Sequence, residues 1–253
     1  MKYVRYRNGA GAAYGLLDGD AVRELRGDLF DHEETGVTHA IAGLQLLHPI
    51  QPGQILCVGR NYQSHLGERK APARPEMFLK SVSSLIGPGA PIVIPAEASN
   101  VHYESELVLV IGTRLKRASV EQAHDGIFGV TCGNDACDRV WQHGPDKDMQ
   151  WWRSKSADTF GPLGPCVVTG IDYGNLLIQT RLNGEIVTRE STADMIFDGP
   201  TIVSFVSQWM TLERGDVIYT GTPDVSRQLH PGDTIEVEIE GIGVLRNPVV
   251  AEA

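Results

Sequence analysis

The sequence predicts a mixed, strand-rich α/β protein, built as a β-sandwich or rolled sheet with few helices and preceded by a small N-terminal β-rich domain. Three observations lead to this fold class. Short runs rich in Val, Ile and Thr dominate from residue 91 onward, whereas only two segments have helical spacing. A strong hairpin signal, Asn183-Gly184, joins two of these runs. A Pro- and Gly-containing segment at residues 48–53 separates the first part of the chain from the rest.

The N-terminal domain is expected to cover residues 1–50. Residues 3–6 alternate between polar and larger apolar or aromatic side chains, and Asn8-Gly9 is a hairpin turn signal. Residues 13–17 and 21–25 are typical of short strands. These elements predict a small unit of antiparallel strands.

The second domain is expected to cover residues 51–253. It begins with an apolar run at residues 55–59 that ends in glycine, which indicates a buried strand leading into a loop of a site. Residues 69–76 are rich in Lys, Arg, Ala and Pro and are expected to form an exposed, mobile loop. Further strands are expected at residues 91–94, 107–111, 127–131, 166–169, 177–182, 186–188, 217–220 and 234–239, and helices at residues 120–124 and 200–210.

Composition excludes several classes of function. The net charge of −10 and the absence of a Lys/Arg cluster argue against binding to nucleic acid. The N-terminus does not resemble a signal peptide, and no apolar run is long enough to span a bilayer, so no membrane partner is expected. The four scattered cysteines have no CxxC pairing and suit reduced thiols. We therefore expect a cytoplasmic protein.

Two carboxylates stand out at the start of a predicted strand. Glu104 and Glu106 are two residues apart in an extended segment, so their side chains point to the same face. Because like charges this close repel, the pair calls for a cation or a raised pKa. Carboxylate oxygens favour Mg²⁺, Mn²⁺ or Ca²⁺. The alternative is a solvated strand face without a ligand.

Further side chains suit the same kind of site. Asp135 follows a strand and would add a third carboxylate, although it would also serve as a turn residue or helix N-cap. Lys155 enters a Gly/Pro-rich loop and is either aimed at an anion or solvated. His65 and Glu68 are three residues apart, so on one helical turn the carboxylate reaches the imidazole and makes it a general base. The alternative for this pair is an unconnected surface location.

Together the motifs resemble the fumarylacetoacetate hydrolase family. The strings lie in family order over about residues 50–250, and they are CVGRNYQSH, MFLKSVSSL, YESELVLVIG, GNDACDRVWQ, KSADTFGPLGP, NGE with STADMIF, GDVIYTGTP and HPGDTIEVEIEGIGVLRNPV. The resemblance implies a mixed β-sandwich roll, a homodimer, and Mg²⁺ or Mn²⁺ in the site. The chain departs from the family after Gly221-Thr222-Pro223, where similar proteins commonly continue with Gly-Val-Gly and a longer loop.

The resemblance also implies roles for individual residues. Glu104, Glu106 and Asp135 match the family's metal carboxylates, and Lys155 matches its site lysine. His65 and Glu68 match a catalytic dyad on a lid segment. Substrate-binding positions of the family match Arg60, Gln142 and Thr222, whereas Lys80 lies in a matching string without an assigned contact.

The function implied by this resemblance is metal-dependent hydrolysis of a C–C bond. The substrate would be an acylpyruvate-type 1,3-dicarbonyl 2-oxo acid, of the kind met in aromatic catabolism, and the products pyruvate and a carboxylic acid. Two alternatives use the same residues: decarboxylation of an oxaloacetate-type acid, and isomerisation or tautomerisation of an unsaturated 2-hydroxy or 2-oxo diacid. A non-catalytic protein that only holds a divalent ion is a fourth alternative.

Overall fold

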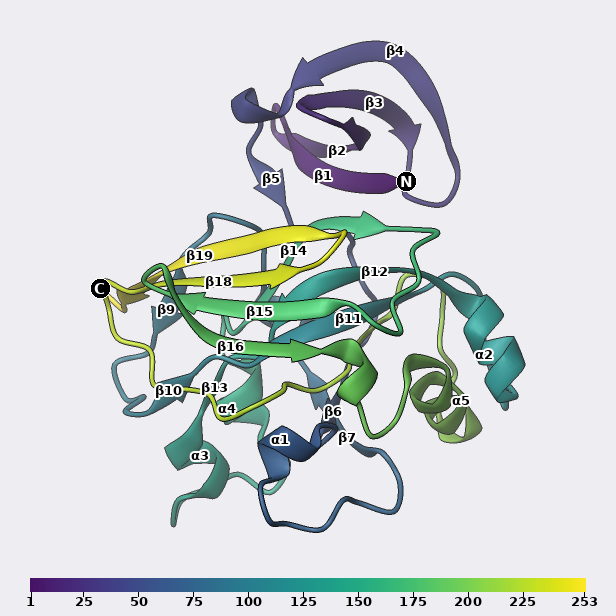
Figure 1. Cartoon of the computed structure of the whole chain (residues 1–253). Helices are drawn as coiled ribbons and strands as arrows, with labels where there is room; N and C mark the ends of the chain where they lie inside the picture. Colours follow the sequence, from purple (N-terminus) through teal and green to yellow (C-terminus); the bar gives the residue numbers. More distant parts are fainter.

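The structure, a computed structural model, describes residues 1–253. Its first strands form a small lobe, which lies above the main body in Figure 1. The lobe is an antiparallel meander of β1 (Lys2–Asn8), β2 (Gly11–Asp18), β3 (Ala21–Gly27) and β4 (His32–Ala40), with the short strand β5 (Leu46–Leu47) paired to β1. None of the helices has the length and apolar character required to cross a membrane.

The largest sheet continues from this lobe into the main body. The link is the pairing of β1 with β14 (Gly161–Val168), through Lys2 with Val168 and Tyr3 with Val167. Beyond β14 the order is β12 (Ile127–Asn134), β11 (Ser105–Ile111), β17 (Val217–Tyr219), β6 (Ile55–Gly59) and β7 (Glu76–Lys80), and β8 (Leu85–Ile86) also pairs with β14. Strand β7 is therefore an edge of this sheet.

A second sheet packs against one face of the first (Figure 1). Its order is β16 (Glu185–Ser191), β15 (Leu177–Leu182), β18 (Thr234–Ile239), β19 (Gly243–Ala251) and β9 (Ile92–Ile94). The predicted hairpin between β15 and β16 is confirmed, with φ of 53° at Asn183 and 84° at Gly184, the positive values that a type I′ turn needs. A two-stranded sheet of β10 (Val101–His102) and β13 (Cys137–Asp138) lies apart from both.

Strand β11 lies at the centre of the core and is buried along its whole length. Leu107 and Leu109 belong to the largest apolar cluster, which also contains residues of β15 and β18. Val108 and Val110 belong to a second cluster on the opposite face of the sheet. Because both faces are covered, the strand is a continuous apolar run rather than an alternating one.

Short helices surround the sheets. They are α1 (Gln63–Leu66), α2 (Val120–Gly126), α3 (Arg139–His143), α4 (Trp152–Ser156) and α5 (Gly199–Trp209), with 3₁₀ turns at η1 (Ile41–Gly43), η2 (Val82–Ser84) and η3 (Thr192–Asp194). The predicted fold class and both predicted helices are confirmed, since α2 and α5 cover the two expected segments. The sequence patterns did not predict β4, β7, β19, α3 or α4, because these elements are polar, irregular or too short to show a period.

Candidate metal centre and active site

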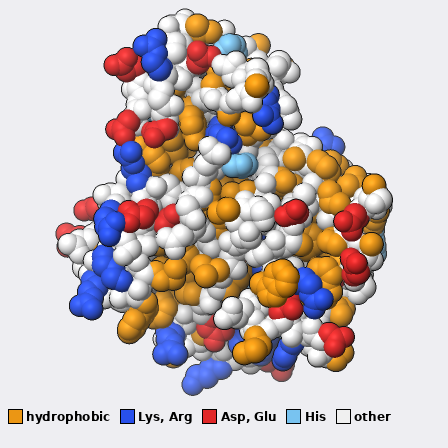
Figure 2. Space-filling model, turned by 180° about the vertical axis from the view of Figure 1, so that it is seen from behind, with side chains coloured by type: hydrophobic (Ala, Val, Ile, Leu, Met, Phe, Trp, Pro, Cys, Tyr) orange, Lys and Arg blue, Asp and Glu red, His pale blue; other side chains and the backbone are white.

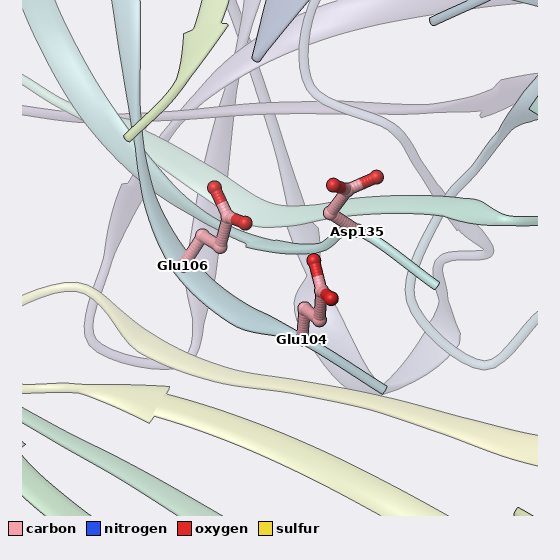
Figure 3. A group of neighbouring side chains, drawn as sticks. All are labelled: Glu104, Glu106 and Asp135. Carbon is pink, nitrogen blue, oxygen red and sulfur yellow. The ribbon is translucent and has the colours of Figure 1, made fainter. Parts of the chain in front are cut away.

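The three predicted metal carboxylates lie together in the structure (Figure 3). Glu104 immediately precedes β11, Glu106 lies within it, and Asp135 follows the neighbouring strand β12. The two strands are antiparallel, and Ser105 pairs with Asn134, so the chain places Asp135 beside Glu104. Each residue offers a carboxylate oxygen that lies within 4.8 Å of the others, and all three side chains are buried.

Hydrogen bonds fix this end of the two strands. The backbone N–H of Asp135 donates to the carbonyl of Glu104 over 2.8 Å, and the side-chain oxygen of Asn134 accepts from the Glu104 N–H over 2.9 Å. Ser105 points to the opposite face, where its hydroxyl accepts from Thr180 at 2.7 Å. The alternation of the strand thus gives the expected arrangement, with both glutamates on one face.

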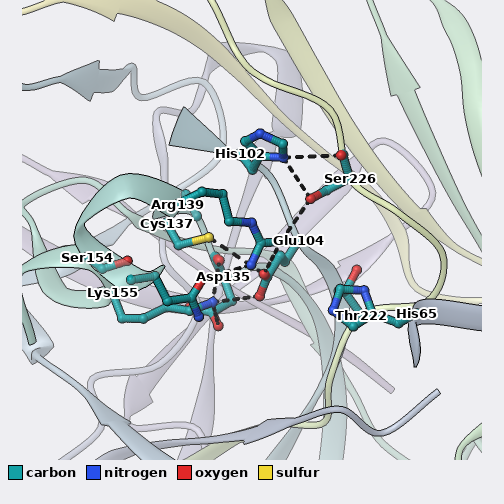
Figure 4. Close-up of polar contacts among 12 residues, drawn as sticks. His65, His102, Glu104, Asp135, Cys137, Arg139, Ser154, Lys155, Thr222 and Ser226 are labelled. Atoms are coloured by element: carbon teal, nitrogen blue, oxygen red, sulfur yellow. Dashed lines mark hydrogen bonds and ion pairs between the residues drawn. The ribbon is translucent and has the colours of Figure 1, made fainter. Parts of the chain in front are cut away.

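Three cationic side chains pair with two of the three carboxylates. Figure 4 shows two of these cations, Lys155 and Arg139, beside Glu104 and Asp135. Lys155 Nζ lies 2.6 Å from Glu104 Oε2 and 2.5 Å from Asp135 Oδ2. The other oxygen of Glu104 lies 2.7 Å from Arg139 Nη2. The other oxygen of Asp135 lies 2.7 Å from Lys80 Nζ. Each of these two carboxylates is therefore held by two cations.

Glu106 is held differently, because no cation pairs with it. Its Oε2 accepts a 2.6 Å hydrogen bond from the backbone N–H of Gly221, and its other oxygen has no hydrogen-bond partner. Burial raises the pKa of Glu106 well above the usual range, and the charges of Asp135 and Glu104 raise it further. Burial also acts to raise the pKa of Glu104, but Lys155 and Arg139 more than offset it and hold that pKa below its ordinary value.

The donor set fits a hard divalent cation. It offers three carboxylates and no thiolate or imidazole within the cluster. One of the carboxylates, Glu106, has an oxygen without a hydrogen-bond partner and no cation beside it. Glu104, Glu106 and Asp135 are therefore the residues that would hold Mg²⁺ or Mn²⁺. A cation placed there would relieve the repulsion that raises the pKa of Glu106.

A cavity of about 310 Å³ opens on this cluster. Glu104, Glu106 and Lys155 line it, whereas Asp135 is fully buried and does not. The predicted substrate-binding residues Arg60, Gln142 and Thr222 line the same cavity, as does the predicted base His65. Arg69, His102, Arg139, His143, Trp151 and Ser226 complete most of its polar and aromatic wall.

The structure does not form the predicted pair of His65 and Glu68. Helix α1 ends at Leu66, and Gly67 follows with φ of 60° and ψ of −123°, so the helical turn that would bring Glu68 to the imidazole does not exist. Glu68 is exposed and makes no hydrogen bond or ion pair with His65. The predicted contact between the Glu68 carboxylate and the His65 imidazole is therefore wrong for this conformation.

A backbone carbonyl takes the place of the carboxylate. His65 Nδ1 lies 2.7 Å from the carbonyl oxygen of Asp224, which only accepts, so Nδ1 carries the proton and Nε2 is the basic nitrogen. Asp224 has φ of 57°, and its N–H donates to Ser64 Oγ over 3.1 Å. The loop after Pro223 is thus bound to helix α1 at two points.

Arg139 was not predicted from the sequence as a residue of the site, and Lys80 had no predicted contact. Arg139 Nη2 contacts both Glu104 and, at 3.0 Å, Ser226 Oγ (Figure 4). Its Nη1 donates to Gln142 Oε1 over 2.8 Å. The available signal was Asp138, whose carboxylate caps helix α3 by accepting from the N–H of Trp141 over 2.8 Å. Recognition of that cap would have placed Arg139 at the first position of the helix, next to the site.

Comparison with known protein families gives two matches along the chain. Residues 54–250 match the family described as Fumarylacetoacetate (FAA) hydrolase C-terminal, and residues 1–49 match the one described as Rv2993c-like, N-terminal. A curated relative, the mitochondrial oxaloacetate tautomerase fahd2 of Xenopus laevis, is 39% identical over 83% of this chain and 69% of its own length.

The solved structures that match over the whole chain include an isomerase and a hydrolase. The 2-hydroxyhepta-2,4-diene-1,7-dioate isomerase of Mycobacterium marinum has a TM-score of 0.92 and 39% identity, over 100% of this chain and 99% of its own. The maleylpyruvate hydrolase of Sphingobium sp. SYK-6, in complex with manganese(II) and pyruvate, has a TM-score of 0.83 and 26% identity, over 100% of both chains. Proteins similar to this chain thus include a tautomerase, an isomerase and a hydrolase.

Proposed function

Because the chain belongs to the fumarylacetoacetate hydrolase family, we propose that it is an enzyme that moves a proton on a small 2-oxo acid, with Mg²⁺ or Mn²⁺ as its cofactor. The reaction that we place first is keto–enol tautomerisation, or the related isomerisation of an unsaturated acid. The observation that carries this proposal is His65, one of three histidines that line the cavity, whose Nδ1 is bound by the Asp224 carbonyl so that Nε2 is left to act as a base. The isomerase and the tautomerase among the relatives also support placing tautomerisation or isomerisation first.

The residues of the cavity have separable roles in this reaction. His65 Nε2 takes a proton from carbon 3 of the 2-oxo acid and returns it to the 2-oxo oxygen, so that the atoms balance without water. Gln142 has its side-chain oxygen bound by Arg139, which leaves its NH₂ group to donate to the oxygen on which negative charge develops. Lys155 and Arg139 hold Glu104 in place. A bound divalent cation would polarise the keto group as a Lewis acid.

Hydrolysis of an acylpyruvate-type C–C bond is the second candidate. The same His65 nitrogen would take a proton from water, and the hydroxide would attack the distal carbonyl. The bond between that carbonyl carbon and carbon 3 would then break, and the proton would return to carbon 3 to give pyruvate and a carboxylic acid. The observation that favours it is the manganese-containing hydrolase relative with bound pyruvate, although that chain is the least similar of the three. In the structure His65 lacks a carboxylate partner, which would stabilise the imidazolium that water activation creates.

A substrate panel tests the proposed function. Oxaloacetate, acetylpyruvate and fumarylpyruvate would be supplied with Mg²⁺ or Mn²⁺ and then with excess chelator, and enol absorbance, pyruvate and CO₂ would be followed separately. We expect fast enol-to-keto conversion with metal and its loss with chelator. Absence of turnover with metal, or turnover that survives complete metal removal, would refute the proposal. Faster release of pyruvate and carboxylic acid than of the tautomer would reverse the order of the two candidates.

We also propose that the protein is a homodimer that associates through the free edge of β7. An apolar groove of about 670 Å³ lies there, lined by Leu79, Met149 and Trp152 among others, and these three side chains are at least half exposed. Phe78 and Trp151 line both this groove and the active cavity. The view from behind in Figure 2 shows apolar side chains gathered in patches on the main body. A second copy would cover the groove and the strand edge.

Light scattering after size exclusion measures this association. We expect a dimer for the wild type and a monomer for Trp152→Glu, because a buried carboxylate would oppose the interface. Ile186→Glu is the matched control, since Ile186 is also an apolar side chain at least half exposed but lies on β16 in the other sheet. A monomeric wild type, or a dimer that survives Trp152→Glu, would contradict the assignment.

A further inference from the structure

Ser226 lines the active cavity but takes no part in the proposed reaction. It lies on the loop after Pro223, the segment in which the chain departs from the family pattern. The loop is bound on both sides of this serine. Asp224 contacts helix α1 before it, and after it the N–H of Leu229 donates to the carbonyl of Val101 over 2.7 Å. Ser226 is therefore held in place at the cavity wall.

Two hydrogen-bond donors surround the Ser226 hydroxyl (Figure 4). Arg139 Nη2 lies 3.0 Å from Oγ, and a guanidinium can only donate. His102 Nδ1 lies 3.1 Å from Oγ and 3.1 Å from the backbone carbonyl oxygen of Ser226. Because that carbonyl oxygen only accepts, Nδ1 carries a proton and donates to both oxygens.

The other ring nitrogen of His102 agrees with this assignment. Nε2 lies 3.0 Å from Oδ1 of Asn100, whose side-chain amide makes no other hydrogen bond. The amide is therefore free to turn and donate from its NH₂ group to Nε2, whereas the backbone carbonyl of Ser226 cannot turn. A doubly protonated ring would carry the Nδ1 proton as well. The Nδ1 proton is thus present whatever the charge of His102.

The hydroxyl of Ser226 consequently has a free proton. Both of its neighbours donate to Oγ, and none of the hydrogen bonds of the protein uses this O–H group as the donor. Gln142 is in the same situation, because Arg139 Nη1 donates to its side-chain oxygen and leaves its NH₂ group free. Arg139 therefore presents two neutral donors to the cavity. A buried O–H group without an acceptor costs free energy, so an oxygen of a bound ligand would stabilise it.

We propose that Ser226 is a substrate-binding residue whose hydroxyl donates to an oxygen on carbon 4 of a 2-oxo acid. This inference rests on the proposed function, because it assumes that the carboxylate and the 2-oxo oxygen are taken up at the carboxylate cluster. Arg139 Nη2 lies between Ser226 Oγ and Glu104 Oε1, at 3.0 Å and 2.7 Å, so the hydroxyl lies outside that cluster. It therefore meets an oxygen further along the acid. Ser226 selects acids that have this oxygen over acids that lack it.

Two acids of equal length test this contact by equilibrium binding. Acetylpyruvate and 2-oxopentanoate both have five carbons and a 2-oxo group, but only acetylpyruvate has an oxygen on carbon 4. Both would be titrated calorimetrically with Mg²⁺ present, in a His65→Asn background that limits turnover. We expect Ser226→Ala to weaken the binding of acetylpyruvate about fivefold, the size of one neutral hydrogen bond. The affinities for 2-oxopentanoate and for Mg²⁺ should stay unchanged.

The unchanged affinities are expected because the neighbours of Ser226 keep other acceptors. Arg139 still has Glu104, and His102 still has the backbone carbonyl of residue 226. Gln228→Ala is the control variant, since Gln228 lies on the same loop and donates to the Ser99 carbonyl over 3.0 Å but does not line the cavity. We expect it to keep the affinities for both acids.

Three results would overturn the role of Ser226 alone. They are an equal loss of affinity for the two acids in Ser226→Ala, which would mean that the serine only positions Arg139, no loss for either acid, and an equal effect of Gln228→Ala. If neither acid bound to the wild-type protein in the presence of Mg²⁺, the proposed function would fail and the role of Ser226 with it.

Discussion

Replacing Glu106 with glutamine is expected to lower the affinity for Mn²⁺ by at least about 100-fold and to abolish turnover. Glu106 is the one carboxylate of the cluster that no protein cation neutralises, so it contributes most of the charge that a metal would satisfy. The amide is nearly the same size, and its oxygen preserves the hydrogen bond from Gly221 N–H. Titration calorimetry with Mn²⁺ measures the loss directly, and thermal shift measures it through linkage of binding to stability.

The choice of Glu106 separates metal binding from folding. Removing Glu104 instead would leave the buried charges of Lys155 and Arg139 without their partner, and breaking a buried ion pair from one side costs about 3–5 kcal/mol. Glu106→Gln replaces a buried carboxyl group that no cation neutralises with a neutral amide, so the metal-free variant should be at least as stable as the metal-free wild type. Glu185→Gln, on the exposed start of β16, is the charge-matched control. Unchanged Mn²⁺ affinity in Glu106→Gln would exclude this residue as a ligand.

The carboxylate cluster was accessible from sequence because it follows from strand periodicity. Two glutamates at positions i and i+2 of a strand share a face whatever the rest of the fold does. Asp135 needed one further fact, that β12 is the antiparallel neighbour of β11, which the structure shows. The resemblance matched Asp135 to a metal carboxylate without that pairing. The strands themselves were predicted well, because buried apolar runs bounded by turn residues can be recognised from the local sequence alone.

The cations and the base could not be placed in the same way. Lys80 reaches Asp135 from the edge strand β7, and Arg139 reaches Glu104 from a five-residue helix, so neither contact leaves a periodic signal. The expected pairing of His65 with Glu68 assumed a helix that continues past Leu66, whereas Gly67 ends it. The partner of His65 is instead a carbonyl 159 positions along the chain, which no local pattern predicts.

Substitution of His65 by asparagine is expected to lower the rate of tautomerisation by about 10²–10⁴-fold, the usual contribution of a general base. The Asn amide can still donate to the Asp224 carbonyl, so helix α1 should keep its contact with the loop while the basic Nε2 is lost. Metal affinity should be unchanged, because His65 is not one of the clustered carboxylates. Hydrolysis of an acylpyruvate should fall as well, whereas decarboxylation of oxaloacetate needs no base and should persist.

Glu68→Gln decides whether the base acts alone. In the structure Glu68 is exposed and unbonded to His65, so its loss should change the tautomerisation rate by less than about threefold, as expected for a surface substitution. A loss as large as that of His65→Asn would mean that helix α1 rearranges on substrate binding and brings the carboxylate to the imidazole. That outcome would restore the dyad expected from the sequence and favour hydrolysis, because the imidazolium formed by activating water would then have a counter-charge. Single-turnover rates for both variants, measured with saturating Mn²⁺, compare the two outcomes without interference from metal binding.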